Sequence, residues 1–223
     1  MASARIAAVL FDLDGTLADT APDMARTVNL MRERRGLASV PLEAVRPHVS
    51  SGARGMIGAA FQVTPGHPQF QAMREEFLDL YADNLCVHSR LFPGMEALLR
   101  SLEQRHIPWG VVTNKFERFA IPVMEGLGLS KRMAVVVGGD TCARAKPFPD
   151  SLLYAAETLR IAPARTLYVG DDERDVQAAR AAGMPVLAAG YGYLGDGPSP
   201  AHWKADAIVN SVEEIGIWIG ANS

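Results

Sequence analysis

Short apolar runs recur along the chain, and helical patterns separate most of them. A strand covered on both faces has no polar face, so such runs are typical of parallel sheets with helices on either side. They predict strands at 6–11, 108–113, 133–137, 166–169, 185–189 and 207–209. Apolar positions at helical spacing predict helices at 96–103, 116–127, 151–159 and 174–182. This alternation predicts an α/β fold with a doubly wound parallel sheet.

A long helical block interrupts the alternation after the first strand. No strand pattern occurs between Thr16 and residue 108, whereas helical spacing predicts a helix that begins near Thr20, a second around Met56 and a third at 68–85. We therefore predict a helical domain at 17–90, inserted into a core of residues 1–16 and 91–223. The alternative is that these helices only cover one face of the sheet.

Polar side chains follow the predicted strands. Ligands of open parallel sheets bind outside the carboxyl ends of the strands, so we expect these side chains to converge on one crevice. They are Asp12 and Asp14 after the first strand, Thr113, Asn114 and Lys115 after the second, Lys146 in the loop after the third, and Asp171 and Asp175 after the fourth.

Carboxylates crowded in one crevice repel one another, and a hard divalent cation removes that conflict. Magnesium prefers oxygen ligands, so Mg²⁺ is the predicted cofactor, with Asp171 on the metal and Asp175 supporting Asp171 or Lys146. A phosphate could then approach the carboxylates. Lys146 and the Thr113 hydroxyl are predicted to bind it, together with the N–H groups that open the helix after Asn114.

The order of the two first acids predicts their roles. Asp12 ends a rigid strand, which suits a nucleophile that attacks phosphorus in line. Asp14 can protonate the leaving oxygen and later deprotonate the attacking water. The predicted chemistry is hydrolysis of a phosphate monoester through an aspartyl-phosphate.

In these motifs the chain resembles the haloacid dehalogenase superfamily, in particular its phosphoglycolate-phosphatase-like branch. The matching segments are DLDGTL at 12–17, VTN at 112–114, KP at 146–147 and GDxxxD at 170–175. The resemblance implies a Rossmann-like core, an all-helical cap after the first strand, and Mg²⁺ bound by Asp12, the main-chain carbonyl of Asp14, and Asp171. It disfavours dehalogenation, because Asp14 supplies the acid that phosphate chemistry needs.

The resemblance also suggests where substrate is recognised. Segment 50–55 looks like the cap loop that reaches into the active site in this branch, so Arg54 is a candidate partner for a substrate carboxylate. Lys115 and His88 are further candidates for substrate contacts. Phosphoglycolate is the first candidate substrate. The chain also looks like phosphatases that act on N-acetylmuramic acid 6-phosphate, and phosphoryl transfer by a sugar phosphomutase is a third possibility.

The composition limits the kinds of partner that the protein is expected to bind. The 223 residues carry a net charge of −3, which gives no basic field for nucleic acid or an anionic membrane surface. Two distant cysteines outside a CxxC pattern fit a reducing cytosol, so a cytoplasmic location is expected. The expected partner is a small phosphorylated metabolite that bears a carboxylate. A phosphoacceptor domain of the receiver type shares clustered acids, Thr and Lys, but it is smaller and lacks an inserted helical domain.

Overall fold

The six predicted strands form one parallel sheet. The computed structural model describes residues 5–195 and 197–222. The strand order is β5-β4-β1-β6-β7-β8, and every neighbouring pair is parallel. The bounds are β1 (Ala8–Phe11), β4 (Trp109–Val112), β5 (Val135–Val137), β6 (Thr166–Gly170), β7 (Val186–Ala189) and β8 (Ala207–Val209). The prediction of a doubly wound parallel sheet is confirmed.

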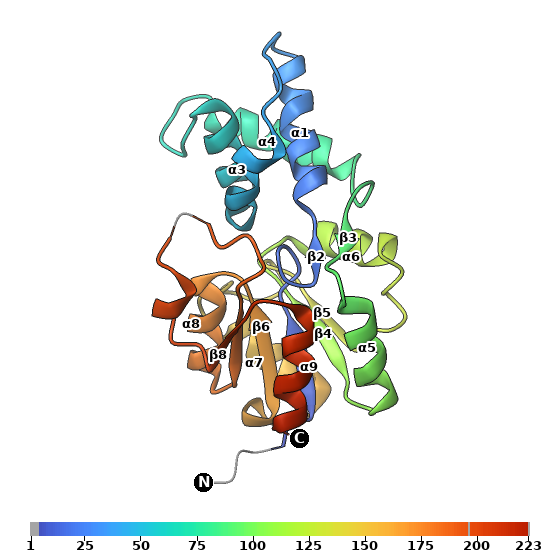
Figure 1. Cartoon of the computed structure of the whole chain (residues 1–223). Helices are drawn as coiled ribbons and strands as arrows, with labels where there is room; N and C mark the ends of the chain where they lie inside the picture. The colour runs from blue at the N-terminus through green and yellow to red at the C-terminus, as the bar shows by residue number, and fades with distance from the viewer. Residues whose placement is uncertain (1–4, 196, 223) are drawn as a thin grey trace.

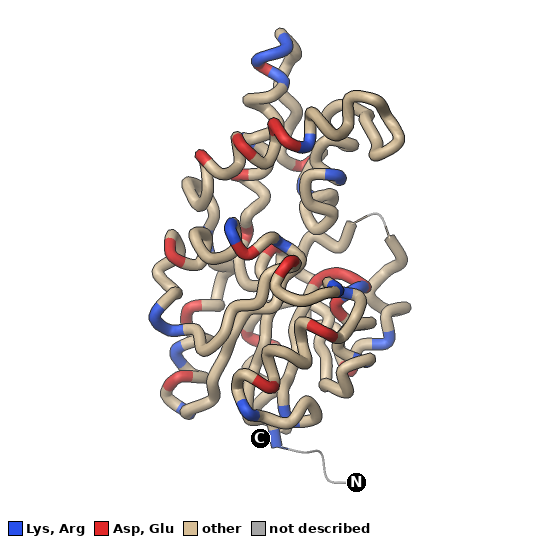
Figure 2. The backbone as a smooth tube through the Cα atoms, turned by 180° about the vertical axis from the view of Figure 1, so that it is seen from behind, with Lys and Arg blue, Asp and Glu red and all other residues tan. Residues whose placement is uncertain are grey.

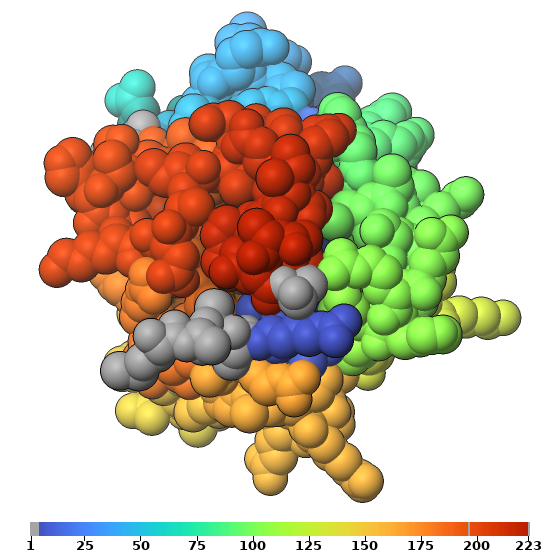
Figure 3. Space-filling model, turned by 60° about the horizontal axis from the view of Figure 1, so that its bottom comes forward, coloured from blue at the N-terminus to red at the C-terminus, as the bar shows by residue number. Residues whose placement is uncertain are grey.

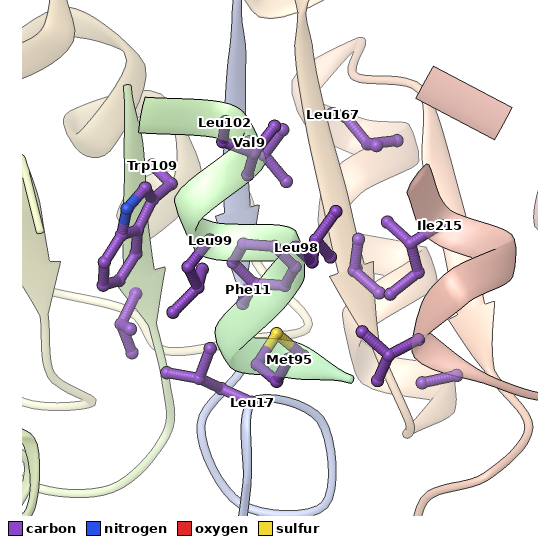
Figure 4. Packing of buried hydrophobic residues seen from close by; sticks show 14 of the residues in the cluster. Val9, Phe11, Leu17, Met95, Leu98, Leu99, Leu102, Trp109, Leu167 and Ile215 are labelled. Carbon is purple, nitrogen blue, oxygen red and sulfur yellow. The ribbon is translucent and has the colours of Figure 1, made fainter. Parts of the chain in front are cut away.

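The central strand β1 is buried on both of its faces. Val9 and Phe11 belong to the hydrophobic cluster on one face, and Leu10 belongs to the cluster on the other. Figure 4 shows α5 (Met95–Gln104) lying across β1, with Leu98 and Leu99 beside Phe11. Burial on two sides is the reason that this strand has no polar position.

Helices cover the two faces of the sheet (Figure 1). One face packs against α5, α6 (Glu117–Gly126) and α9 (Val212–Ala221), and the other against α7 (Asp150–Leu159) and α8 (Glu173–Ala182). The 3₁₀ helices η2 (Pro163–Arg165) and η3 (Pro200–His202) lie in connecting loops. The described ends of the chain meet at the amino edge of the sheet, where the Ile6 N–H donates to the Asn222 carbonyl (Figure 3).

The segment between Thr16 and α5 contains two short strands, so the prediction that no strand occurs between Thr16 and residue 108 was wrong. The strands β2 (Ala18–Asp19) and β3 (Arg90–Leu91) pair antiparallel. Two residues are too few to show an alternating pattern. The pairing brings together the two ends of the helical segment that the sequence predicts as an insertion.

Four helices follow between β2 and β3 and lie beyond the carboxyl ends of the sheet strands (Figure 1). They are α1 (Ala21–Glu33), α2 (Leu42–Val45), α3 (Gly52–Phe61) and α4 (Phe70–Ala82), with the 3₁₀ helix η1 (Arg46–Ser51) before α3. These helices share a hydrophobic cluster to which Phe119 and Tyr193 of the rest of the chain also contribute. The boundaries of a cap domain at residues 17 and 90 stay a prediction.

Charged residues of both signs are interspersed along the chain (Figure 2). None of the described helices combines the length and the apolar composition that crossing a bilayer requires.

Candidate active site

Three neighbouring strands bring the predicted acids and hydroxyl to one place. In the sheet β1 lies between β4 and β6, and Phe11 is aligned with Val111 and with Val169. The carboxyl ends of these strands therefore lie at about the same level, so Asp12, Thr113 and Asp171 emerge side by side. All three side chains are buried.

A tight turn at Gly15 packs the first acidic segment against Asp171. Gly15 has a φ of +86°, and a Cβ at this position would collide with the Asp171 carboxylate. The Thr16 hydroxyl donates to Asp171 Oδ1 over 3.0 Å, and the Tyr193 N–H donates to Oδ2 over 2.8 Å. The Asp171 carboxylate is therefore held in one orientation.

Three carboxylates form a buried acidic cluster. Asp12, Asp171 and Asp175 each place an oxygen within 4.8 Å of the others. Burial raises the pKa of Asp12 to about 6, although the Lys146 charge lowers it. Burial also raises the pKa of Asp171 well above its usual range, and the charges of Asp12 and Asp175 add to this effect. Such crowding is relieved by a divalent cation.

Two carboxylates of this cluster fit a metal site. Asp12 Oδ1 is buried and accepts no hydrogen bond from the described residues, although the Lys146 ammonium lies 2.9 Å away as an ion pair. Asp175 is already engaged, because its Oδ1 accepts from Lys146 and Tyr168 and its Oδ2 accepts from the Asp172 N–H. Asp171 accepts only from neutral groups, the Thr16 and Ser50 hydroxyls and the Tyr193 N–H, and forms no ion pair with a described residue. Its uncompensated charge, beside the Asp12 carboxylate, makes Asp12 and Asp171 the pair best placed to hold a divalent ion.

Lys146 is the cation at the centre of the cluster. Its ammonium lies 2.6 Å from Asp175 Oδ1 and also donates to the Tyr168 hydroxyl and the Val112 carbonyl. The charges of Asp12 and Asp175 outweigh burial and raise the pKa of Lys146, so it stays charged. The Asn114 amide holds the main chain of Lys146, because its Oδ1 accepts from the Lys146 N–H and its Nδ2 donates to the Lys146 carbonyl. Asp175 thus supports Lys146, one of the two predicted alternatives.

The Asp14 carboxylate lies apart from the acidic cluster. Lys115 Nζ lies 2.9 Å from each of its oxygens, and the Thr20 hydroxyl donates to Oδ1. The helix α1 begins next to Thr20 as predicted, with Thr20 as its N-cap residue, but the Thr20 side chain makes no capping bond because it binds Asp14 instead. Lys115, a candidate for substrate contact, thus has its ammonium on Asp14 in this structure.

A cavity of about 270 Å³ lies between the sheet edge and the helices above it. Its floor includes the predicted residues Asp12, Asp14, Thr113, Asn114 and Lys146. Its upper wall is largely apolar and aromatic, formed by Met24, Val49, Phe77, Leu78, Tyr81, Phe116 and Phe119.

Two arginines reach this cavity from the helices above. Arg54 on α3 was a predicted candidate, and Arg74 on α4 was not. The other cations in the lining are paired, Lys115 with Asp14, Lys146 with Asp12 and Asp175, and Arg174 with Asp172. Neither Arg54 nor Arg74 forms an ion pair with a described carboxylate.

His88 lies away from this cavity. Its side chain is exposed, and its main-chain N–H donates to the Asp23 carboxylate. It is absent from the described residues that line the cavity. The structure therefore does not bring His88 together with the other candidates.

Three tyrosines of the site were not predicted. Tyr168 bonds Lys146, Tyr193 bonds Asp171 through its N–H and the start of α1 through its hydroxyl, and Tyr81 packs over Lys115. Each lies in a segment whose pattern indicates a buried strand, a loop or an apolar helix face. Only their hydroxyl groups, in otherwise apolar surroundings, could have drawn attention to them.

The fold and the site together define a class of enzyme. Carboxylates, a buried lysine and a threonine at the carboxyl ends of a doubly wound sheet, below a cavity roofed by helices, are suited to phosphoryl chemistry. The model of the haloacid dehalogenase-like hydrolase family matches residues 9–189. The chain belongs to this family.

Relatives named as phosphatases align over nearly the whole chain. An N-acetylmuramic acid 6-phosphate phosphatase of Pseudomonas aeruginosa is 46% identical over 95% of this chain and 93% of its own length. A phosphoglycolate phosphatase of Xanthomonas campestris pv. campestris is 48% identical over 93% of this chain and 94% of its own length. A crystal structure of a predicted phosphoglycolate phosphatase from Haemophilus somnus superposes with a TM-score of 0.83 at 27% identity, covering 96% and 97% of the two chains. The prediction of a phosphatase is confirmed.

Proposed function

We propose that the protein hydrolyses a carboxylated phosphate monoester through an aspartyl-phosphate on Asp12, with Mg²⁺ as cofactor. The observation that carries this proposal is the Asp12 carboxylate, which lines the cavity directly after β1 and is paired with the Lys146 ammonium over 2.9 Å. A carboxylate at the end of a rigid strand, beside a cation that can also meet the phosphoryl oxygens, suits an in-line nucleophile.

Each of these residues has its own role in the two steps of the reaction. An Asp12 oxygen bonds to phosphorus while the bond from phosphorus to the ester oxygen breaks, and Asp14 gives its proton to the departing oxygen. Water then attacks the phosphoryl group and passes a proton to Asp14, which releases phosphate and restores Asp12. Lys146 and Thr113 stabilise the charge on the phosphoryl oxygens. Mg²⁺, held by Asp12, Asp171 and the Asp14 carbonyl, would neutralise the repulsion between carboxylate and phosphate.

Metal binding gives a test that does not depend on turnover. Adding Mg²⁺ at about one hundred times its dissociation constant is expected to stabilise the fold by about 2.7 kcal/mol, seen as a rise in melting temperature. A chelator should abolish turnover and this rise. Asp171→Asn should lose the rise, because it removes one carboxylate of the cluster.

The matched control for the metal experiment is Asp172→Asn. Asp172 pairs with Arg174 and caps α8, and asparagine is an equally good N-cap. This variant should keep the metal-dependent rise. If Mg²⁺ raises the melting temperature of Asp171→Asn as much as that of the wild type, Asp171 is not a ligand of the metal.

The apolar wall of the cavity favours the larger of the two candidate substrates. N-acetylmuramic acid 6-phosphate carries acetamido and lactyl methyl groups that could cover Phe77, Tyr81 and Phe119, which line the cavity. Phosphoglycolate has a single CH₂ group and would leave most of this wall uncovered. Phosphoglycolate remains the second candidate, since relatives with that name are up to 48% identical.

Steady-state kinetics with both substrates tests this choice. We expect a higher kcat/KM for N-acetylmuramic acid 6-phosphate, with inorganic phosphate as the product. A higher kcat/KM for phosphoglycolate would reverse the choice of substrate. Return of the phosphate to an isomer of the substrate would indicate a mutase.

Arg54 and Arg74 are proposed to bind the substrate carboxylate, because both line the cavity without an ion-pair partner. Arg54→Ala or Arg74→Ala should raise KM for the carboxylated substrate by about 10- to 100-fold, the loss of one charge-assisted hydrogen bond. The effect on p-nitrophenyl phosphate should be about twofold or less. Arg26→Ala is the control, because Arg26 is exposed on α1 and is absent from the described lining. Equal losses on both substrates would exclude this role.

The helical segment 17–90 is proposed to act as a cap that closes over the substrate and excludes water. Contacts across its boundary support this role. The Ser50 carbonyl accepts from Arg174, and the Tyr193 hydroxyl accepts from the Thr20 and Ala21 N–H groups.

A cytoplasmic location is proposed because the two cysteines, Cys86 and Cys142, are not joined in a disulfide.

A further inference from the structure

Lys115 makes the closest charged contact of Asp14, the proposed acid and base. Its Nζ lies 2.9 Å from both carboxylate oxygens, and the two side chains are 6% and 13% exposed. A buried ammonium that meets both oxygens of a carboxylate restricts the rotation of that carboxylate as well as neutralising it. Lys115 therefore fixes where the two Asp14 oxygens lie.

A second contact, from the Thr20 hydroxyl, also holds the Asp14 carboxylate. The Thr20 hydroxyl donates to Asp14 Oδ1, so among the described residues this oxygen has two donors, whereas Oδ2 has only Lys115. The contact sets are separate, because Asp12, Asp171 and Asp175 form the acidic cluster and Asp14 is not part of it. The pair of donors thus keeps the Asp14 carboxylate away from the oxygens that suit a metal ion.

Lys115 is itself held by a residue of the helical segment. The ring centroid of Tyr81 on α4 lies 4.9 Å from Lys115 Nζ, which is within the range of a cation–π contact. Tyr81 is buried and its hydroxyl has no hydrogen-bond partner among the described residues. The Tyr81 ring therefore packs against the same ammonium that contacts Asp14.

We propose that Lys115 is a positioning residue for Asp14, held in place by Tyr81 of α4, and that it aims the Asp14 carboxyl at the ester oxygen of the substrate. This role rests on the proposed phosphatase mechanism. In the first step Asp14 gives its proton to the ester oxygen as the bond from phosphorus breaks, and in the second it takes one from the attacking water. Both transfers need the same carboxyl to be at hydrogen-bonding distance of the reacting oxygen.

The competing role for Lys115 is direct binding of the substrate, and the two roles differ in their dependence on the leaving group. An alkyl phosphate needs a proton on its departing oxygen, whereas p-nitrophenolate leaves without one. A residue that positions Asp14 therefore matters more for the alkyl ester. A residue that binds phosphate matters equally for both esters and acts mainly on KM.

The experiment compares kcat for an alkyl phosphate and for p-nitrophenyl phosphate in Lys115→Met, Asp14→Asn and the double variant. Lys115→Met should lower kcat for the alkyl ester by at least about tenfold more than for the aryl ester, since general acid catalysis contributes about 10²–10⁴-fold. Asp14→Asn should show the same preference. The double variant should be no worse than Asp14→Asn, because the two residues act as one unit.

Further variants keep the test decisive if Lys115→Met folds poorly, as its melting temperature would reveal. Lys115→Gln retains a donor without the charge and should show the same preference to a smaller extent. Tyr81→Leu removes the ring from Lys115 and should shift the ratio of the two rates in the same direction. Equal losses on both esters, or additive losses in the double variant, would overturn the positioning role. If the wild-type protein hydrolyses neither ester, the proposed function fails instead.

Discussion

Replacing Asp12 by asparagine is expected to lower kcat by at least about a thousandfold, the largest loss of activity for any single change in this chain. The amide is a poor nucleophile and cannot form the acyl-phosphate, and loss of a nucleophile in other hydrolases costs this much or more. The measurement is phosphate release under saturating Mg²⁺ with the preferred substrate.

The Asp12→Asn protein should remain folded. Lys146 loses one ion pair but retains Asp175, Tyr168 and the Val112 carbonyl, so the melting temperature should not fall appreciably. Asp79→Asn, an exposed position on α4, is the matched control and should keep full activity. A folded Asp12→Asn protein with more than about a tenth of the wild-type kcat would be incompatible with Asp12 as the nucleophile.

The second large effect is expected for Lys146→Met, which should impair both stability and activity. Lys146 is 5% exposed and faces two carboxylates, so its removal leaves Asp12 and Asp175 buried without their cation. Breaking a buried ion pair by removing one partner costs about 3–5 kcal/mol. For a chain of this size that corresponds to a fall in melting temperature of about 10 °C.

Activity of Lys146→Met should fall by at least about a hundredfold even at a temperature where the variant is folded, because the phosphoryl oxygens lose a charged donor. Lys131→Met, at an exposed position, controls for the loss of a lysine. A melting temperature close to that of the wild type would show that the buried ion pairs of Lys146 contribute little to the free energy of unfolding. An unchanged kcat in the folded variant would show that Lys146 does not stabilise the phosphoryl oxygens during the reaction.

The sheet could be predicted from the sequence because its strands are buried on both faces. A run such as Val9-Leu10-Phe11 has no polar position to confuse with a helix face, and helices with regular apolar spacing separate the runs. The β2–β3 pair could not be predicted, since Ala18–Asp19 pairs with Arg90–Leu91 across more than seventy residues of chain. Nothing local in either dipeptide indicates a strand.

The core of the site was also predictable, because it depends on strand ends. Asp12, Thr113 and Asp171 converge as the position of β1 between β4 and β6 requires. The contacts of Lys115 and Tyr81 were not predictable, since they join the loop after β4 to α4 across the cavity and depend on how the helices sit above the sheet. For the same reason Arg74 escaped notice, while His88 was selected from a local run that the fold directs to the surface.

The central claim is that Asp12 carries the phosphoryl group during turnover. The most direct measurement is acid quenching of the enzyme with its substrate, reduction of the acyl-phosphate with borohydride, and mass spectrometry of the tryptic peptide that spans residues 6–26. The account predicts that Asp12 alone is reduced to homoserine, and only when substrate and Mg²⁺ are both present. Reduction at Asp14 or at another carboxylate, or continued turnover with no reduced residue in the quenched enzyme, would contradict it.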